Sequence, residues 1–359
     1  MHTRFLPLIA IAGLLACGSD QPGADTGAAG RGAVSSGVAL TGAGATFPYP
    51  IYSRWFSDYA QRTGIKINYQ SVGSGGGIRQ LTEQTVDFGA TDSPMTAEEM
   101  GRAQGGRVLH IPTVIGAVVV TYNLPGVSRP LRLTGEVISD IFLGRITKWN
   151  DPRIVALNPG VSLPNQDALV VHRSDGSGTT FVFTDYLAEV SPQWRSGPGR
   201  GKEVQWPVGL GAKGNEGVAA QVKATPGAIG YTELTYAKQN RLPYASVRNA
   251  EGQFVAPSVE TVSSAAEGAL AALPDTTDYR VSIVNAPGAN SYPISSFTWL
   301  LVYAAQPDSV KGRKLVDFLR WALSEGGQSA AHLDYAPLPP AMVSRLEARL
   351  SSIRVGATE

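Results

Sequence analysis

The sequence has little cysteine, little histidine and almost no net charge. Cys17 is the one cysteine among 359 residues, so disulfide bonds play no part in the fold. The four histidines are scattered, and they lack the spacing of a metal site. With 30 basic and 29 acidic side chains the net charge is +1, which does not indicate nucleic acid or an anionic membrane surface as a partner. Glycine, at 41 residues, is abundant and predicts many tight turns and close backbone approaches.

Long hydrophobic runs are also missing. Residues 5–15 are apolar but too short to span a bilayer, and no later run is long and apolar enough to do so. With a basic start before them and the letters LLAC at 14–17, they resemble the signal of a bacterial lipoprotein, which is cut before a cysteine that is then lipidated. An ordinary secretory signal is the alternative.

We therefore expect residues 1–17 to be a signal and residues 18–37, which are rich in Gly, Ala, Ser and Asp, to be a flexible linker. The protein would be exported, either to the periplasm or to the cell surface. A lipid on Cys17 would hold the globular body near a membrane without embedding it.

Beyond residue 37, strand-like and helix-like segments alternate, which predicts an α/β fold. Aromatic side chains recur at helical spacing between residues 52 and 59. Residues 114–122 and 297–303 are near-continuous apolar runs, the pattern of strands buried on both faces. Because these two strands lie far apart in the sequence, we expect them to cross between two domains.

Three loops share one chemistry. Residues 44–47, 73–75 and 177–179 each follow a predicted strand, place a hydroxyl beside glycine and open a predicted helix. The start of a helix has unpaired backbone N–H groups and a partial positive charge, and glycine lets an anion approach them closely. Taken singly, each loop is an ordinary helix cap. Taken together, with Arg173 close by, they indicate a site for a small oxyanion.

Nucleotide binding and catalysis have weaker support. No segment has the phosphate-loop pattern, and residues 209–214 match the dinucleotide fingerprint without a good strand before them, so we interpret them as a structural turn. His172, Asp175 and Ser177 are the residue types of a hydrolytic triad, but they lie too close together in sequence to form one. Ser177 is also outside a nucleophile elbow. We therefore expect a binding protein without a cofactor or metal, not an enzyme; a secreted phosphohydrolase using Ser177 is the remoter alternative.

Several segments, in order, resemble the periplasmic phosphate-binding protein of the bacterial high-affinity phosphate ABC importer. They are TGAGATFPYPIY at 41–52, VDFGATDSP at 86–94 and RSDGSGTTFVFT at 173–184, and the similarity continues to the C-terminal helix. The resemblance implies a type II periplasmic-binding-protein fold: two α/β lobes joined by a strand hinge, with the ligand in the cleft between them. Lobe I would comprise residues 38–117 and 297–359, and lobe II residues 118–296.

The resemblance also implies the ligand and its contacts. It assigns Asp175 as the partner of Arg173, and the membrane permease and ATPase subunits of the importer as the protein's partners. Asp92 would accept the proton of hydrogenphosphate, which sulfate lacks, so a binder of sulfate or molybdate is the nearer alternative that Asp92 argues against. The residues that the resemblance implies for phosphate binding are Thr46, Phe47, Ser74, Asp92, Arg173, Ser177, Gly178 and Thr179.

Overall fold

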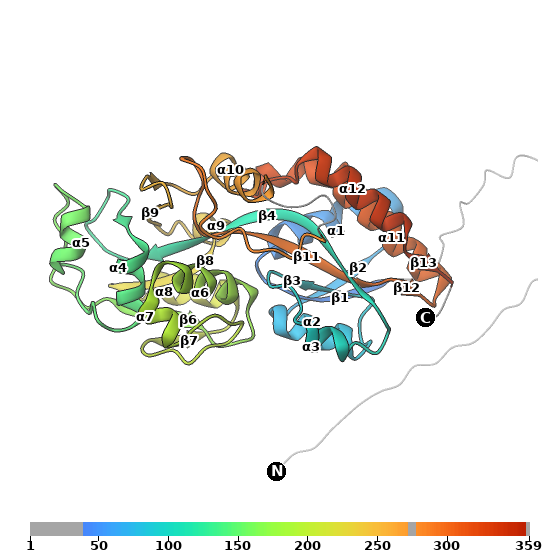
Figure 1. Ribbon diagram of the computed structural model, residues 1–359, viewed down its shortest axis with the longest axis horizontal. Helices are drawn as coiled ribbons and strands as arrows, with labels where there is room; N and C mark the ends of the chain where they lie inside the picture. Colours follow the sequence, from blue (N-terminus) through green and yellow to red (C-terminus); the bar gives the residue numbers. More distant parts are fainter. Residues whose placement is uncertain (1–38, 272–277, 357–359) are drawn as a thin grey trace, which may run out of the picture. The chain divides into compact units, whose positions relative to one another are not determined.

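The computed structural model describes residues 39–271 and 278–356, and a mixed sheet of eight strands runs through them (Figure 1). The strand order is β2-β1-β3-β11-β4-β8-β6-β7. The bounds of these strands are β1 (Leu40–Gly44), β2 (Ile67–Ser71), β3 (Phe88–Thr91), β4 (Val108–Tyr122), β6 (Leu169–Arg173), β7 (Leu210–Ala212), β8 (Ala228–Glu233) and β11 (Ser295–Tyr303).

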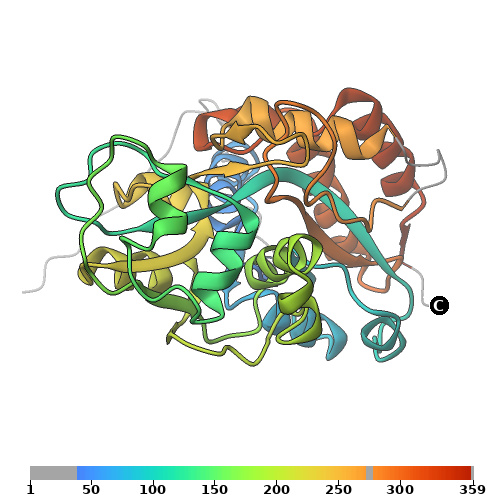
Figure 2. The ribbon, with the colours of Figure 1, turned by 60° about the vertical axis from the view of Figure 1, so that its left-hand side comes forward.

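The two long strands predicted from apolar runs are present and pair with each other. β4 and β11 run antiparallel, and all of their residues are buried. β4 pairs with β11 from Val108 to Ala117 and with β8 from Val118 to Tyr122, so it belongs to both halves of the sheet. In Figures 1 and 2 this teal strand runs without a break from the green and yellow segments to the blue and red ones.

β4 begins six residues earlier than the apolar run at 114–122 predicts. The polar residues His110 and Thr113 interrupt the apolar pattern in its first part, but both have hydrogen-bond partners in the structure. His110 accepts the N–H of Met95 at 3.0 Å, and burial lowers the pKa of His110 to about 3, so the ring is neutral. The Thr113 hydroxyl donates to the Thr298 carbonyl at 3.2 Å. Paired in this way, polar side chains occupy a buried strand without a large desolvation cost.

The half of the sheet formed by β2, β1, β3 and β11 packs against helices from both ends of the chain. α1 buries the aromatic face predicted between residues 52 and 59, and its rings contact Phe318 of the C-terminal region. α3 begins with a capping box formed by Thr96 and Glu99. These elements are α1 (Tyr49–Thr63), α2 (Ser74–Thr82), α3 (Ala97–Gly101), α11 (Ser309–Leu323), the 3₁₀ helix η1 (Gly326–Leu333), α12 (Pro340–Ser351) and the short strands β12 (Ala305–Gln306) and β13 (Arg354–Val355).

The middle of the chain surrounds the other half of the sheet. α8 packs against β6 and β8, and a small separate sheet has the order β10-β9-β5. The elements are α4 (Gly135–Phe142), α5 (Pro152–Leu157), α6 (Gly178–Val190), α7 (Pro192–Ser196), α8 (Gly214–Ala224), α9 (Leu234–Gln239), α10 (Val259–Leu270), β5 (Arg132–Leu133), β9 (Ser246–Arg248) and β10 (Phe254–Val255).

The structural turn predicted at residues 209–214 is wrong. Residues 210–212 form β7, which pairs in parallel with β6, and α8 begins at Gly214. β7 has three residues, lies at the edge of the sheet and exposes 59% of Leu210. A strand of this kind has neither the alternating nor the continuous apolar pattern by which strands are found in a sequence.

Two expectations concern residues outside the described ranges. The signal ending at Cys17 and the linker at 18–37 both fall there. Within residues 39–271 and 278–356, every helix is too short or too polar to cross a membrane.

The packing of α2 on the sheet gives a first prediction. A Cβ on Gly77 would lie 2.5 Å from the Gly44 Cα and 2.6 Å from the Ala43 carbonyl oxygen, whereas a Cβ on Gly217 of α8 would meet no atom closer than 3.6 Å. We expect Gly77→Ala to lower the free energy of unfolding by about 1–3 kcal/mol because the backbone must move. Gly217→Ala, the control, should raise it by up to about 1 kcal/mol through helix propensity. Urea unfolding followed by circular dichroism measures both, and wild-type stability in Gly77→Ala would contradict the prediction.

Candidate functional site

The three loops singled out in the sequence lie together in the structure. Ser74 Oγ accepts the N–H of Gly178 at 3.1 Å, and the Gly75 N–H donates to the Gly176 carbonyl at 2.9 Å, so the starts of α2 and α6 are in contact. The loop before α1 is joined to them through the side chain of Asn215. The residues expected to bind the anion are all buried: Thr46, Phe47, Ser74, Asp92, Arg173, Ser177, Gly178 and Thr179.

Arg173 ends β6 and is held by Asp175. The guanidinium donates from Nε at 2.8 Å and from Nη2 at 2.6 Å to the two carboxylate oxygens, while Nη1 lies 3.4 Å from Thr179 Oγ1. Asp175 Oδ1 also accepts the Gly214 N–H at 3.0 Å. Burial alone would raise the pKa of Asp175, but the bonds and charge of Arg173 and the Gly214 N–H outweigh it, so this pKa lies below its ordinary value. The guanidinium is therefore held in one position in the interior, and 1% of the Arg173 side chain is exposed.

Asp92 follows β3 and is 1% exposed. Its Oδ1 accepts the Thr298 hydroxyl at 2.8 Å, and its Oδ2 lies 3.5 Å from Ser74 Oγ. Burial raises the pKa of Asp92 to about 7, although the Thr298 hydrogen bond, the Arg173 charge and the Ser74 hydrogen bond each act to lower it. This carboxyl group is therefore divided between its acid and its carboxylate near neutral pH.

Ser177 and Gly178 begin α6 with separate tasks. Ser177 Oγ accepts the N–H of Thr180 at 3.0 Å, which is an ordinary N-cap and leaves the hydroxyl hydrogen free to be donated elsewhere. A Cβ on Gly178 would lie 2.4 Å from Ser74 Oγ and 2.5 Å from Asp92 Oδ2. Glycine at this position therefore lets Ser74 and Asp92 approach the start of α6.

The triad residue types do not form a triad here. His172 Nδ1 lies 3.0 Å from the Arg173 carbonyl oxygen, and its ring stacks on Trp206 with centroids 4.7 Å apart. In the part of the chain that the structure describes, no hydrogen bond joins His172 to Ser177, and no group of three or more His, Cys, Asp or Glu side chains is arranged to hold a metal ion.

Sequence reasoning missed three residues that support this site. Asn215 contacts Thr46 Oγ1 through its amide nitrogen at 2.8 Å. Tyr236 donates to the Thr46 carbonyl at 2.6 Å, and Tyr335 donates to the Phe47 carbonyl at 2.7 Å. The start of a helix at 214 is the sequence signal that points to Asn215, and interpreting residues 209–214 as a turn hides this signal. The two tyrosines come from distant segments, and nothing in the local sequence marks them.

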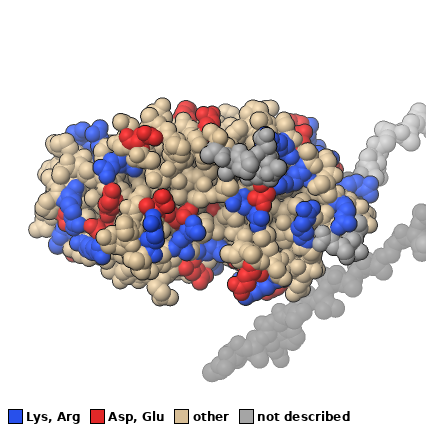
Figure 3. Space-filling model, in the orientation of Figure 1, with Lys and Arg blue, Asp and Glu red and all other residues tan. Residues whose placement is uncertain are grey.

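A cavity of about 560 Å³ borders Asp92. The cations in its wall are neutralised by acids: Lys202 lies 2.5 Å from Glu99, and Arg200 lies 2.9 Å from Asp185. Figure 3 shows the same mixture over one face of the molecule, where acidic and basic side chains are interspersed. A basic surface around the cavity therefore does not supply the attraction for an anion, and the positive groups at the site are the buried Arg173 and the starts of the helices.

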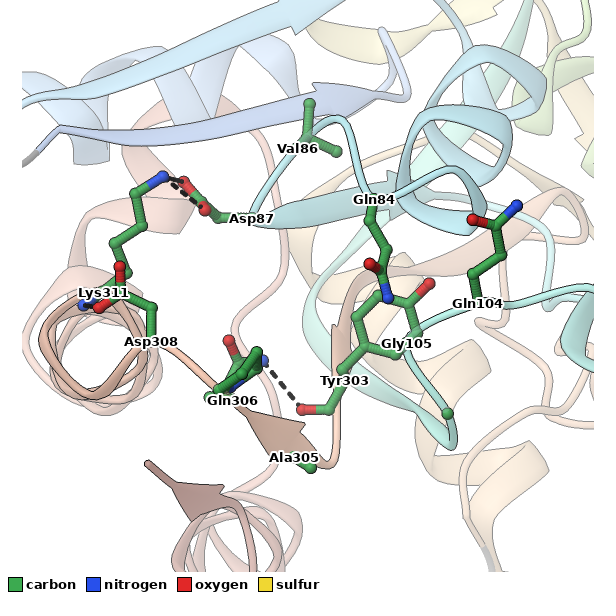
Figure 4. Close-up of a pocket in the computed structure, with 12 residues that line it drawn as sticks. Gln84, Val86, Asp87, Gln104, Gly105, Tyr303, Ala305, Gln306, Asp308 and Lys311 are labelled. Atoms are coloured by element: carbon green, nitrogen blue, oxygen red, sulfur yellow. Dashed lines mark hydrogen bonds and ion pairs between the residues drawn. The ribbon is translucent and has the colours of Figure 1, made fainter. Parts of the chain in front are cut away.

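A second cavity, of about 620 Å³, lies between the end of β11 and the start of α11 and contains none of the predicted site residues (Figure 4). Lys311 and Asp87 in its wall form an ion pair with 2.9 Å between Nζ and Oδ1. Asp87 also accepts the backbone N–H of Thr41 at 2.7 Å. These contacts join α11 to the strands beside it, so the ion pair drawn in Figure 4 has a structural role.

Known proteins are similar to this chain in sequence. A family model described as a PBP superfamily domain matches residues 20–325. The phosphate-binding protein PstS of Pasteurella multocida is 48% identical over 313 residues, which cover 86% of this chain and 89% of that protein. The protein of the same name in Methanocaldococcus jannaschii is 40% identical over 359 residues, with 93% and 89% covered.

Solved structures resemble this one in fold. A high affinity periplasmic phosphate-binding protein bound with phosphate has a TM-score of 0.69 at 22% identity, and the match covers 87% of this chain and 93% of that one. A phosphate-binding protein from Stenotrophomonas maltophilia has a TM-score of 0.69 at 20% identity, with 90% and 96% covered. The likeness confirms the two-lobed α/β fold expected from the sequence.

The raised pKa of Asp92 has a defined effect on stability. In an unfolded chain the group titrates near its ordinary value of 3.8, and in the folded protein near 7. Between these values the unfolded state releases its proton while the folded state keeps it, so the contribution of Asp92 to stability is present below pH 4 and is lost as the pH rises to 7. A difference of about three pKa units corresponds to roughly 4 kcal/mol.

We therefore expect Asp92→Asn to stabilise the anion-free protein at pH 8, and to do so by up to about 4 kcal/mol more than at pH 4. The amide oxygen still accepts from Thr298, and the amide N–H₂ faces Ser74, so the shape of the site is kept. Urea unfolding of both proteins at the two pH values gives the difference. If Asp92→Asn raises the free energy of unfolding by the same amount at pH 4 and at pH 8, Asp92 does not titrate as described.

Proposed function

Because the chain belongs to the family of PstS phosphate-binding proteins within the PBP superfamily, we propose that it binds inorganic phosphate and delivers it to a phosphate ABC importer. The observation that carries the proposal is the combination of a buried, fixed Arg173 with a buried acceptor, Asp92, among the starts of three helices. The activity is binding without turnover.

The proposed site supplies donors from both side chains and backbone. Arg173 contributes the positive charge, and the helix starts contribute N–H groups with their partial positive charge. Hydroxyls add neutral donors on several sides of the anion. The proposed phosphate-binding residues are Thr46, Phe47 through its backbone N–H, Ser74, Asp92, Arg173, Ser177, Gly178 and Thr179, with Asp175 holding the arginine.

Asp92 is proposed to select for phosphate. Hydrogenphosphate carries a proton that a carboxylate can accept, whereas sulfate would place an oxygen lone pair against the same carboxylate. An unsatisfied buried charge costs a few kcal/mol, which corresponds to at least a hundredfold in affinity. Selectivity then comes from rejection of the wrong anion as much as from attraction of the right one.

The binding cycle is proposed to be the closing of two lobes around the anion. Lobe I would comprise residues 38–117 and 297–359, and lobe II residues 118–296, with β4 and β11 as the connection. The change of pairing partner along β4 after Ala117 supports this division. The ion pair of Lys202 with Glu99 and the bond from Gly75 to Gly176 would join the two lobes when they close over the ligand.

Export and anchoring complete the proposal. Residues 1–17 would be a lipoprotein signal, and a lipid on Cys17 would hold the protein at a membrane through the linker at 18–37. The anchored protein would meet the permease and ATPase subunits of the importer at that membrane.

Replacing the proposed lipidation site tests the anchor. We expect Cys17→Ser to move the protein from the membrane fraction to the soluble exported fraction of the producing cells, because one acyl-bearing residue provides the attachment. Replacement of Ser19 by alanine is the matched control and should leave the fractionation unchanged. Continued membrane association of Cys17→Ser would mean that something other than a lipid on this residue attaches the protein to the membrane.

Calorimetric titration of the protein freed of bound anion tests the function. We expect one phosphate per chain at about pH 9, similar binding of arsenate, and sulfate weaker by at least about a hundredfold, because Asp92 is then a carboxylate while phosphate still carries one proton. Asp92→Asn should narrow the gap between phosphate and sulfate by at least about tenfold, because an amide donates to sulfate.

Asp58→Asn, the same change at an ion pair on the surface of α1, is the control and should leave both affinities unaltered. If the wild type binds phosphate and sulfate equally, Asp92 does not select between them, although the site still binds oxyanions. A wild-type protein that takes up neither anion would refute the proposed function.

A further inference from the structure

We infer that Asn215 is a positioning residue that fixes the direction in which two threonine hydroxyls of the site donate their hydrogens. The inference rests on the proposed function, since the acceptor of those hydrogens is the bound phosphate. Asn215 is the second residue of α8 and is fully buried. It lies between Thr46, before α1, and Thr179, in the first turn of α6.

The orientation of the Asn215 amide is determined by its oxygen. Oδ1 lies 3.0 Å from the backbone nitrogen of Glu233 and 3.0 Å from the Thr232 hydroxyl. A backbone N–H can only donate, so the atom that faces it must be the amide oxygen. The amide nitrogen is therefore on the opposite side, toward the two threonines.

The amide nitrogen uses both of its hydrogens there. Nδ2 lies 2.8 Å from Thr46 Oγ1 and 3.0 Å from Thr179 Oγ1. An amide N–H₂ group has two donors and accepts nothing, so both threonine oxygens act as acceptors toward Asn215. Neither hydroxyl hydrogen can point at this residue.

A second donor occupies each threonine oxygen. The backbone N–H of Asn215 lies 3.3 Å from Thr46 Oγ1, and Arg173 Nη1 lies 3.4 Å from Thr179 Oγ1. A hydroxyl oxygen has two lone pairs and one hydrogen, so the lone pairs of both threonines are used. Across residues 39–271 and 278–356, neither hydroxyl donates to a protein acceptor.

The two hydroxyl hydrogens are thereby committed to an acceptor that is not part of the protein. In the proposed complex they point to phosphate oxygens, and no hydroxyl has to rotate when the anion arrives. Donors that are already aligned bind an anion more tightly than donors that must reorganise. A single amide sets the direction of both hydroxyl hydrogens at once.

An isosteric change reverses the arrangement. Asn215→Asp keeps an oxygen toward Thr232 and Glu233 but replaces the amide nitrogen with an acceptor, so both threonine hydrogens turn toward the new carboxylate. We expect phosphate affinity to fall by at least about a hundredfold. In a Thr46→Val or a Thr179→Val background, where one of the two hydroxyls is absent, the same change should cost at least about tenfold less.

Comparing the loss of phosphate affinity in the three backgrounds separates the effect of hydroxyl direction from charge repulsion and from damage to the fold. Repulsion between an aspartate and phosphate is present in every background, so equal costs of Asn215→Asp in all three would overturn the inference. Wild-type affinity in Asn215→Asp would overturn it too. Absence of phosphate binding by the wild type would overturn the proposed function first, and the inference with it.

A matched control is Asn249→Asp. The Asn249 amide nitrogen lies 3.1 Å from the Gly288 carbonyl and 3.0 Å from the Ala289 carbonyl, outside the site. Its replacement should lower the thermal midpoint and leave phosphate affinity unchanged. Asn215→Asp also places a carboxylate in the interior and should lower the midpoint too, but of the two variants it alone should lower phosphate affinity. An equal loss of affinity in Asn249→Asp would mean that damage to the fold is enough to weaken binding.

Discussion

A guanidinium buried in a protein interior has to be paired, and the pairing of Arg173 with Asp175 is the interaction around which the site is built. Two hydrogen bonds hold the ion pair in one plane, and the Gly214 N–H holds the carboxylate in turn. Because Asp175 neutralises most of the charge, Arg173 can remain buried without a ligand. An Nη1 hydrogen of Arg173 reaches Thr179, and from there the hydrogen-bond network extends to the amide of Asn215 and to the loop before α1.

The fold provides for this network by bringing strand ends together. β6 ends at Arg173, β3 ends one residue before Asp92, and β1 ends two residues before Thr46. β1 and β3 run parallel in one half of the sheet, whereas β6 lies in the other half and runs in the opposite direction, and each strand leads into a loop of the site. Strand ends from the two halves thus bring together side chains that lie far apart in the sequence and hold them on rigid supports. Hydroxyls and the amide of Asn215 then connect these strand ends around the ion pair of Arg173 with Asp175.

Much of this could be predicted from local patterns. The spacing of Tyr52 and Trp55 predicts α1, and the apolar runs predict β4 and β11, because burial leaves a periodic signature. The loop glycines and hydroxyls predict an anion site because helix starts have a common chemistry. Asn215 was not found because its task depends on two threonines that lie 36 and 169 residues away in the sequence. The edge strand before it was also missed, since three half-exposed residues leave no periodic trace.

The position of β11 in the sheet also constrains the order in which the chain can fold. β4, β8, β6 and β7 are all present once residue 233 has been made, so this half of the sheet can pair from a contiguous stretch of chain. β3, in contrast, reaches β4 only through β11, which ends at Tyr303. The strands nearest the N-terminus therefore wait for residues near the C-terminus, with a loop of about 200 residues to be closed, and such long-range pairing is slow. β1, β2 and β3, the first of the described strands to be synthesised, are thus among the last to take their places in the complete sheet.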